Sequence, residues 1–221
     1  MSVTIAEELL LLAYSEKEGK QLISASQLDP ALGGAILAEL AINERVALTG
    51  KKVSLEDATP LGDDELDAAL ARIAEERKER KPDWWVQRFH STKLRRRLLV
   101  RLAETGVLAE ERGKVLGIFP TTRWPEADGS VEAEVRQRVS GVLAGAEPDG
   151  RTAVLIAVMH AAKLDRKAFP GADKARIKEI SEGDWAGDAV AKTIAAINSV
   201  MVIAATTAAI GASTGATTAG S

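Results

Sequence analysis

The stretch WWVQRFHSTKLRRRLLVRLAETGVLAEERGKVLGIF, residues 84–119, decides much of the fold that this sequence predicts. Leu94, Leu98 and Leu102 recur at the spacing that places side chains on one face of a helix. Gly106 follows this periodic segment, at a position where helices commonly end in a left-handed residue. The short apolar segments 107–109 and 115–119, on either side of Arg112-Gly113-Lys114, predict a β-hairpin. The stretch therefore predicts a helix followed by a hairpin.

The same order of elements occurs earlier in the chain. Residues 26–41 predict a helix that has apolar residues on one face. Residues 45–49 and 53–55 then predict two strands joined by a turn at Gly50-Lys51-Lys52. Two loosely matched copies of a helix-plus-hairpin unit are a weak internal repeat, but each supports the prediction of the other.

The other segments predict mainly helices. Thr4 and Glu7 form a capping box before an apolar run, and Asp63 precedes a helix with alternating charges. Pro82 begins a short helix that carries Trp84 and Trp85, both of which we expect in the core. Further helices are predicted for residues 130–142 and 152–164.

The segment from Thr193 to Gly211 has no charged residue, which raises the question of a membrane span. Most of its residues are Ala, Thr, Ser, Asn or Gly, whose transfer into lipid gains little free energy. We therefore expect a buried central helix. The sequence predicts one mainly α-helical domain over residues 1–211, with the two hairpins as its strands, and a disordered tail over residues 212–221.

The composition excludes several kinds of chemistry. The chain has no cysteine, so it has no disulfide, thiolate zinc site or cysteine nucleophile. Its two histidines, His90 and His160, lie far apart in the sequence, and no phosphate-binding loop motif is present. We find no catalytic residues and no metal or cofactor site, and we expect a cytoplasmic protein that is not an enzyme.

The helix of residues 94–105 belongs to a basic segment of an acidic protein. Residues 85–102 contain six basic residues and no acidic residue, although the net charge of the chain is −3. If the leucines face the core, Arg96 points outward, Arg95 lies on one flank, and Arg97 and Arg101 lie on the other. The patch could be a solvated face paired with Glu104, Glu110, Glu111 and the acids of residues 63–80. It could also bind phosphates, either in DNA through a winged-helix arrangement of Arg95 to Arg101 or in lipid headgroups.

Five segments, in the same order along the chain, resemble the Golgi phosphoprotein 3 family. The most specific likenesses are G-x-x-x-x-E-L-A, here Gly34–Ala41, and R-x-R-L-x-x-x-L-x-x-x-G-V-L, here Arg95–Leu108. The resemblance covers residues 4 to about 205. The segments are EELLLLAYSEKEGK, LGGAILAELAINERVAL, TPLGDDELDAALARI, LRRRLLVRLAETGVLAEERGKVLGIFPTTRWP and TAVLIAVMHAAKL.

The resemblance implies a compact helical fold that binds membranes peripherally through phosphatidylinositol 4-phosphate. Eukaryotic members of the family also act as adaptors for the tails of Golgi glycosyltransferases. Arg95 stands at a lipid-binding position of the family, whereas Ser24, Gly33 and Thr92 replace a Trp and two Arg of its pocket. Because guanidinium groups suit phosphate, we expect the headgroup contacts to come from a basic cluster. Its members are Arg95, Arg97, Arg96 and Lys93.

The family also has a hairpin linked to membrane contact and oligomerisation. By position it should be Thr121 to Glu132, with Trp124 as its apolar residue. An exposed Trp would suit the boundary between water and lipid, although Trp124 could instead fold back onto the domain. The sequence thus predicts a peripheral membrane protein that binds anionic phospholipid or phosphoinositide, with a protein tail or a second copy as a further partner. Winged-helix DNA binding is the alternative.

Overall fold

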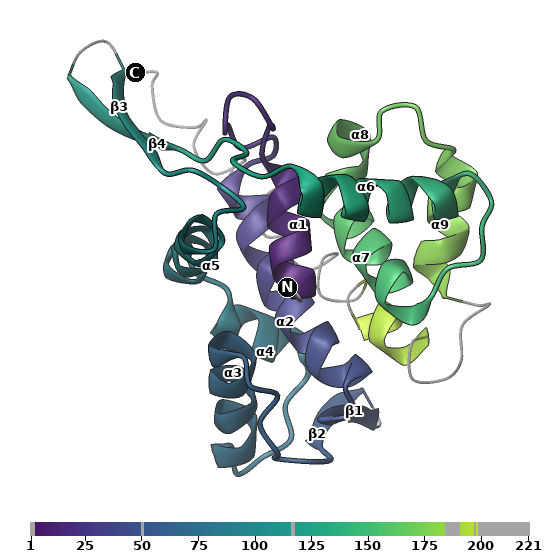
Figure 1. Cartoon of the computed structure of the whole chain (residues 1–221). Helices are drawn as coiled ribbons and strands as arrows, with labels where there is room; N and C mark the ends of the chain where they lie inside the picture. Colours follow the sequence, from purple (N-terminus) through teal and green to yellow (C-terminus); the bar gives the residue numbers. More distant parts are fainter. Residues whose placement is uncertain (1–2, 50, 116–117, 184–190, 197, 199–221) are drawn as a thin grey trace, which may run out of the picture.

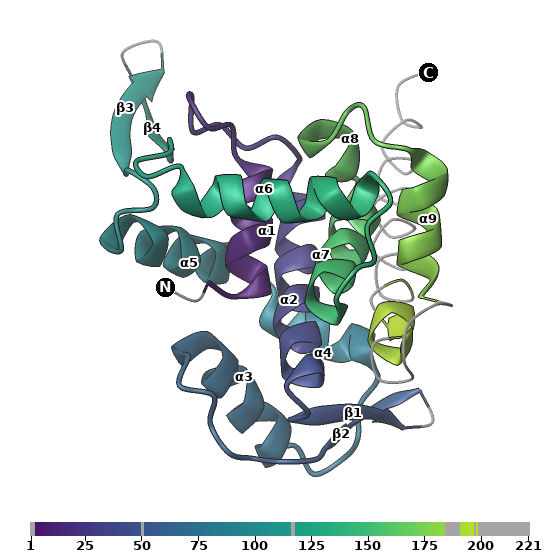
Figure 2. The same cartoon turned by 45° about the vertical axis from the view of Figure 1, so that its right-hand side comes forward.

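Three buried helices form the centre of the computed structural model, which describes residues 3–49, 51–115, 118–183, 191–196 and 198. They are α1 (Ile5–Ala13), α2 (Ala25–Ile42) and α7 (Gly150–Ala161), and each packs against the other two. All residues of α1 are buried, as are Leu28 to Leu40 of α2. Most residues of this stretch of α2 are apolar, and its two acids, Asp29 and Glu39, pair with arginines. Such a helix is stable only inside a core, which agrees with the central position of α2 in Figures 1 and 2.

The other helices cover this centre from two sides. On one side lie α3 (Asp64–Glu75), α4 (Pro82–Phe89) and α5 (Thr92–Glu104). On the other side lie α6 (Ser130–Leu143), α8 (Asp165–Ala168) and α9 (Lys174–Glu182), as Figure 1 shows. The prediction of a mainly helical fold with two small antiparallel hairpins is confirmed.

The capping signals that the sequence predicts are present. Thr4 and Glu7 form the capping box of α1, and the Asp63 carboxylate accepts from the backbone N–H groups of Glu65 and Leu66 at the start of α3. Gly106, which follows α5, has a φ of 77°, the left-handed conformation expected of a residue that ends a helix.

The first hairpin agrees with the sequence, whereas the second lies further along the chain than expected. The first consists of β1 (Val46–Thr49) and β2 (Lys52–Leu55). The second consists of β3 (Glu111–Val115) and β4 (Phe119–Arg123), and it projects from the domain in Figure 1. Residues 107–109 were expected to begin its first strand, but Leu108 instead forms an isolated bridge with Glu126, and the Ala109 N–H donates to the carbonyl of Pro125. The strands of the hairpin pair from Glu111 with Arg123 to Val115 with Phe119, so residues 112–114 are not its turn.

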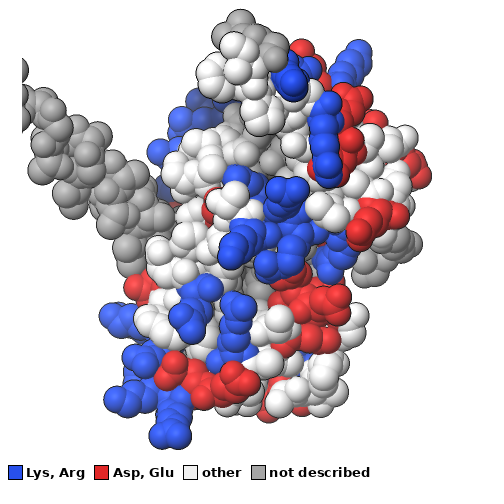
Figure 3. Space-filling view, turned by 90° about the vertical axis from the view of Figure 1, so that its left-hand side faces the viewer, with Lys and Arg blue, Asp and Glu red and all other residues white. Residues whose placement is uncertain are grey.

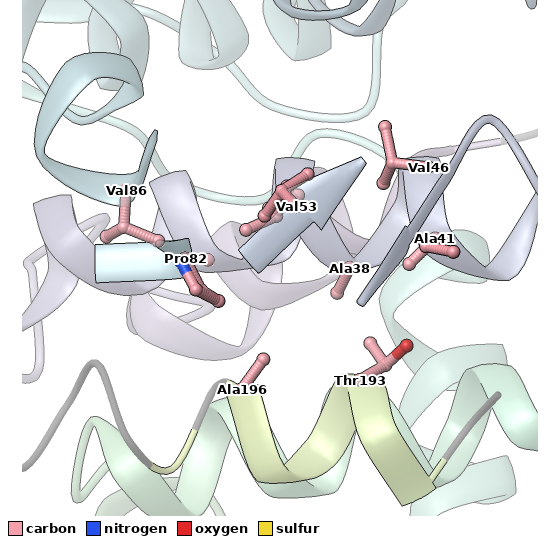
Figure 4. Close-up of a pocket in the computed structure, with 11 residues that line it drawn as sticks. Ala38, Ala41, Val46, Val53, Pro82, Val86, Thr193 and Ala196 are labelled. Atoms are coloured by element: carbon pink, nitrogen blue, oxygen red, sulfur yellow. The ribbon is translucent and has the colours of Figure 1, made fainter. Parts of the chain in front are cut away.

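A short helix at residues 191–196 closes one side of the core. Thr193 and Ala196 face α2, the first hairpin and α4 across a narrow apolar cavity (Figure 4). The cavity measures about 20 Å³, room for about one water molecule, so it is a packing seam and not a ligand site. Thr193 and Ile194 are buried, as expected for the start of the C-terminal apolar helix. The rest of that predicted helix and the predicted tail, residues 212–221, lie outside the described residues. Within the described part of the chain, the model contains no helix with the length and apolar character needed for a membrane span.

Candidate functional site: helix α5 and the second hairpin

Helix α5 presents a basic surface because its apolar residues are used for packing. The Ser91 hydroxyl accepts from the backbone N–H of Leu94 and caps the helix. Leu94, Leu98 and Leu102 are buried, as the sequence predicts. Helical geometry then places the basic side chains on the flanks and on the outer face. What these side chains contact decides which of them can bind a ligand.

Arg95 turns inward and meets a carboxylate of the central helix. Its Nη1 lies 2.9 Å from Oδ1 of Asp29 on α2, and the two side chains are only 13% and 12% exposed. Burial raises the pKa of Asp29, and the charge of Arg95 opposes this shift. The contact therefore joins α2 to α5, and a lipid phosphate would have to replace Asp29 in order to reach Arg95.

Arg97 and Arg101 are also paired, on the flank that faces α3. Arg97 forms a two-pronged contact with Glu65, in which Nη2 donates to Oε2 over 2.8 Å. Arg101 donates to Glu7 of α1 and to Asp63, each over 2.7 Å. The Glu65 and Asp63 contacts agree with the interpretation that acids of residues 63–80 pair with this helix, whereas the contact with Glu7 was not predicted.

Lys93 and Arg96 are exposed, as is Arg97 beside its partner Glu65. Neither Lys93 nor Arg96 makes an ion pair within the described part of the chain. Both line an open groove along α5, which Asp64 and Glu65 border at the start of α3. Figure 3 shows basic side chains across the middle of this face, with acidic side chains beside them toward the lower right. Of the four residues predicted to contact headgroups, these two are therefore exposed and without an ion-pair partner among the described residues.

Three residues stand at positions that the resemblance assigns to a lipid-binding pocket, and none of them is a tryptophan or an arginine. The Ser24 hydroxyl donates to the side chain of Gln27 over 2.8 Å at the start of α2. A Cβ atom on Gly33 would lie 2.9 Å from the carbonyl oxygen of Val86, so an arginine cannot be accommodated without moving the backbone of α4. The Thr92 side chain is hydrogen-bonded to Asp29. Gly33 thus lies where α2 packs closely against α4.

The second hairpin carries the most exposed large apolar residues among those described. Ile118 is 75% exposed and Phe119 is 62% exposed, at the end of the hairpin that projects from the domain. Trp124 was expected either to be the exposed apolar residue of a hairpin at residues 121–132 or to fold back onto the domain, and the second alternative is observed, because Trp124 is only 6% exposed. It lies at the base of β4, where its backbone N–H donates to the carbonyl of Gly19 over 3.1 Å.

A cluster of acidic side chains surrounds one arginine beside the base of this hairpin. Arg136 of α6 donates to buried Glu132 over 2.7 Å, and its Nε lies 3.1 Å from Glu16. The backbone N–H of Glu126 donates to the carbonyl of Glu16 over 2.9 Å. Burial raises the pKa of Glu132 to about 7, because Arg136 compensates only part of the cost of burying its charge.

Sequence reasoning missed three features of this surface. Ile118 and Phe119 were assigned to the second strand of the hairpin. Their exposed position could have been found from the glycine at 117, because a turn glycine within an apolar segment indicates the tip of a hairpin. Trp84 was expected in the core, but it is 36% exposed, whereas Trp85 is buried as expected. The partner of Arg95 has no local signal, since Asp29 is distant in the sequence.

No group of three or more His, Cys, Asp or Glu in the described residues is arranged to hold a metal ion. The comparison with known families gives one match. The sequence model of Golgi phosphoprotein 3 (GPP34) matches residues 5–197, which is most of the chain and includes α5 and both hairpins. That family is not a known enzyme family. The chain therefore belongs to the Golgi phosphoprotein 3 family.

Proposed function

We propose that this protein docks reversibly on anionic membranes through the outer face of α5 and the tip of the second hairpin. The observation that carries the proposal is the exposure of Lys93 and Arg96, neither of which has an ion-pair partner among the described residues. Family membership supports a role of this kind. The net charge of −3 makes attraction depend on local basic surfaces such as this one, because the protein as a whole is repelled by an anionic membrane.

The expected affinity is moderate and depends on salt. A basic side chain close to an anionic surface contributes about 1 kcal/mol, so Lys93 and Arg96 together contribute about 2 kcal/mol. The apolar side chains of Ile118 and Phe119 add a second contribution when they enter the interface. Such attachment is reversible, because neither contribution approaches that of a transmembrane helix.

The headgroup that the family suggests is phosphatidylinositol 4-phosphate, and we propose it as the preferred lipid. Lys93 and Arg96 make the first contact with its phosphate. Arg95 and Arg97 take part only if the phosphate replaces their partners, Asp29 and Glu65. Arginine suits this exchange because its guanidinium binds phosphate and carboxylate with the same two-pronged geometry.

The second hairpin also suits contact with another copy of the protein. A two-stranded hairpin is marginally stable alone in water, and β3–β4 pair only with each other among the described residues. Family resemblance adds a role as an adaptor for protein tails, which requires that the membrane-bound protein keep a further surface free. We propose both as consequences of docking, since docking concentrates and orients the protein.

Co-sedimentation with vesicles tests the proposal. Neutral vesicles are compared with vesicles that contain phosphatidylserine or phosphatidylinositol 4-phosphate, and duplex DNA is included as a competitor. Lys93→Glu/Arg96→Glu should abolish binding to anionic vesicles. The matched control, Arg166→Glu/Lys174→Glu, changes the same charge on α8 and α9 and should bind like wild type. Wild-type protein that stays in the supernatant with all anionic vesicles, or that prefers DNA, would refute the proposal.

A further inference from the structure

Helix α4 presents a tryptophan on its outer side that the proposed docking surface does not include. Trp85, Val86 and Phe89 are buried on the inner side of α4, whereas Trp84 is 36% exposed. The ring of Trp84 rests edge-on against Trp85, with 4.7 Å between their centroids. The core therefore fixes the position of Trp84 while leaving part of its ring accessible.

Two guanidinium groups lie next to the exposed ring. The Cζ atoms of Arg80 and Arg88 lie 5.0 Å and 6.0 Å from the centroid of Trp84, within the range of a cation–π contact. Arg80 also pairs with Glu76 over 3.2 Å. Arg88 makes no ion pair in the part of the chain that the structure describes. An indole held between cations presents apolar area and positive charge together.

The basic character of this cluster continues along the chain into α5. Residues 80–96 contain one acid, Asp83, which is half-buried. Apart from Asp83, the exposed and half-exposed side chains of this span are basic or uncharged. Arg95 is paired with Asp29, and the other Lys and Arg residues of the span are Arg80, Lys81, Arg88, Lys93 and Arg96. Figure 3 shows basic side chains both across the middle of this face and on its lower left.

We propose that Trp84, with Arg80, Lys81 and Arg88, forms a second contact with the anionic membrane, at which Trp84 enters the interface between water and lipid. This inference rests on the proposed function. Trp prefers that interface because it is amphipathic, and long basic side chains reach phosphates from there. The four residues of this second contact lie on α4 or just before it, and the exposed Lys93 and Arg96 follow on α5. An extended flat surface can contact all of them at once, which favours a membrane over a peptide.

Fluorescence quenching by lipids with brominated acyl chains tests whether Trp84 reaches the bilayer. The experiment compares wild type with Trp84→Phe on phosphatidylserine vesicles, with both proteins fully bound. Quenching should fall by at least half in Trp84→Phe, because the remaining described tryptophans, Trp85 and Trp124, are buried. Thermal unfolding followed by circular dichroism shows whether the variant stays folded. Equal quenching of the two proteins would overturn the inference.

Charge removal tests the same contact independently. Lys81→Gln/Arg88→Gln should weaken vesicle binding by about 25-fold, or about fivefold for each cation removed. The control is Arg166→Gln/Lys174→Gln, which should have no effect. If Lys93→Gln/Arg96→Gln weakens binding and Lys81→Gln/Arg88→Gln does not, this inference fails while the proposed function stands. If wild type binds no anionic vesicle, both fail. Binding of duplex DNA that depends on Trp84, without lipid quenching, would assign the surface to another polyanion.

Discussion

The guanidinium of Arg95 lies 2.9 Å from the carboxylate of Asp29, and both side chains are almost fully enclosed between α2 and α5. Arg95 is thus an interior charge of a helix whose outer face is basic. The cations of α5 are therefore of two kinds. Some, such as Arg95, pair with acids of other helices, and others, such as Arg96, have no ion-pair partner among the described residues.

Removal of Arg95 should destabilise the protein. Arg95→Gln removes the charge that opposes the cost of burying the Asp29 carboxylate, and we expect the free energy of unfolding to fall by about 3 kcal/mol. Asp29→Asn should change it less, because burial already raises the pKa of Asp29 and so disfavours its charged form. The measurement is urea unfolding of Asp29→Asn, Arg95→Gln and the double variant. The double variant should be more stable than the sum of the single effects predicts, since neither charge is then left alone. Strictly additive effects would contradict this account.

Two adjacent glycines of α2 should respond in opposite ways to replacement by alanine. A Cβ atom on Gly33 would lie within 2.9 Å of the backbone of Val86, whereas one on Gly34 meets nothing within 4 Å. Gly33→Ala should therefore lower stability by about 1–3 kcal/mol. Gly34→Ala should raise it by about 0.5–1 kcal/mol, because alanine loses less backbone entropy in a helix. Thermal unfolding of both variants checks the prediction, and a destabilised Gly34→Ala would contradict it.

Glu132 should make the protein more stable as the pH falls from 8 to 5.5. Its pKa is about 7 in the folded protein, above the ordinary value of 4.5, so the folded state binds the proton more tightly. This contribution to stability is fully present below pH 4.5 and is lost as the pH rises through 7. Burial of Glu126 next to Glu16 raises the pKa of Glu126 as well, with the same sign.

The comparison of Glu132→Gln with wild type isolates this group. The variant should be more stable than wild type at pH 8 by on the order of 2 kcal/mol, and the difference should vanish near pH 5. Urea unfolding at a series of pH values measures it. A difference that does not change with pH would show that Glu132 does not titrate in this range.

Substitutions at the tip of the second hairpin should affect membrane binding, whereas substitutions at its base should affect stability. Ile118→Ser/Phe119→Ser should reduce vesicle binding and leave the unfolding temperature unchanged, because both side chains are exposed. Trp124→Ala should lower the free energy of unfolding by about 3–5 kcal/mol, as expected for a large buried aromatic residue. Unaltered binding by the tip variant would exclude the hairpin from the docking surface.

The sequence predicted the elements of this fold better than their contacts. The leucine repeat of α5 and the cap at Asp63 are local signals, and both elements form where these signals place them. The second hairpin was placed too early because Gly113 and the glycine at 117 both suit a turn, and local chemistry does not choose between them. The contacts of residues 107–109 with residues 125–128 decide the choice, and these contacts are not visible in the local sequence.

The candidate site shows the same division. The outward position of Arg96 follows from helical periodicity and is confirmed by its exposure. The inward position of Arg95 depends on Asp29, a residue of another helix, so no local pattern could reveal it. Trp84 is different, because the spacing of Trp85 and Phe89 already indicates which side of α4 faces the core.

The central claim is that the unpaired cations of α5 bind the membrane, whereas the paired cations maintain the fold. The most direct measurement is the affinity for phosphatidylserine vesicles of two double variants, Lys93→Gln/Arg96→Gln and Arg95→Gln/Arg97→Gln, together with their unfolding temperatures. We predict that the first variant binds about 25-fold more weakly and unfolds like wild type. The second should bind within about threefold of wild type at temperatures where it is folded, and should unfold at a lower temperature. The reverse pattern, with binding lost only in the second variant, would contradict the claim.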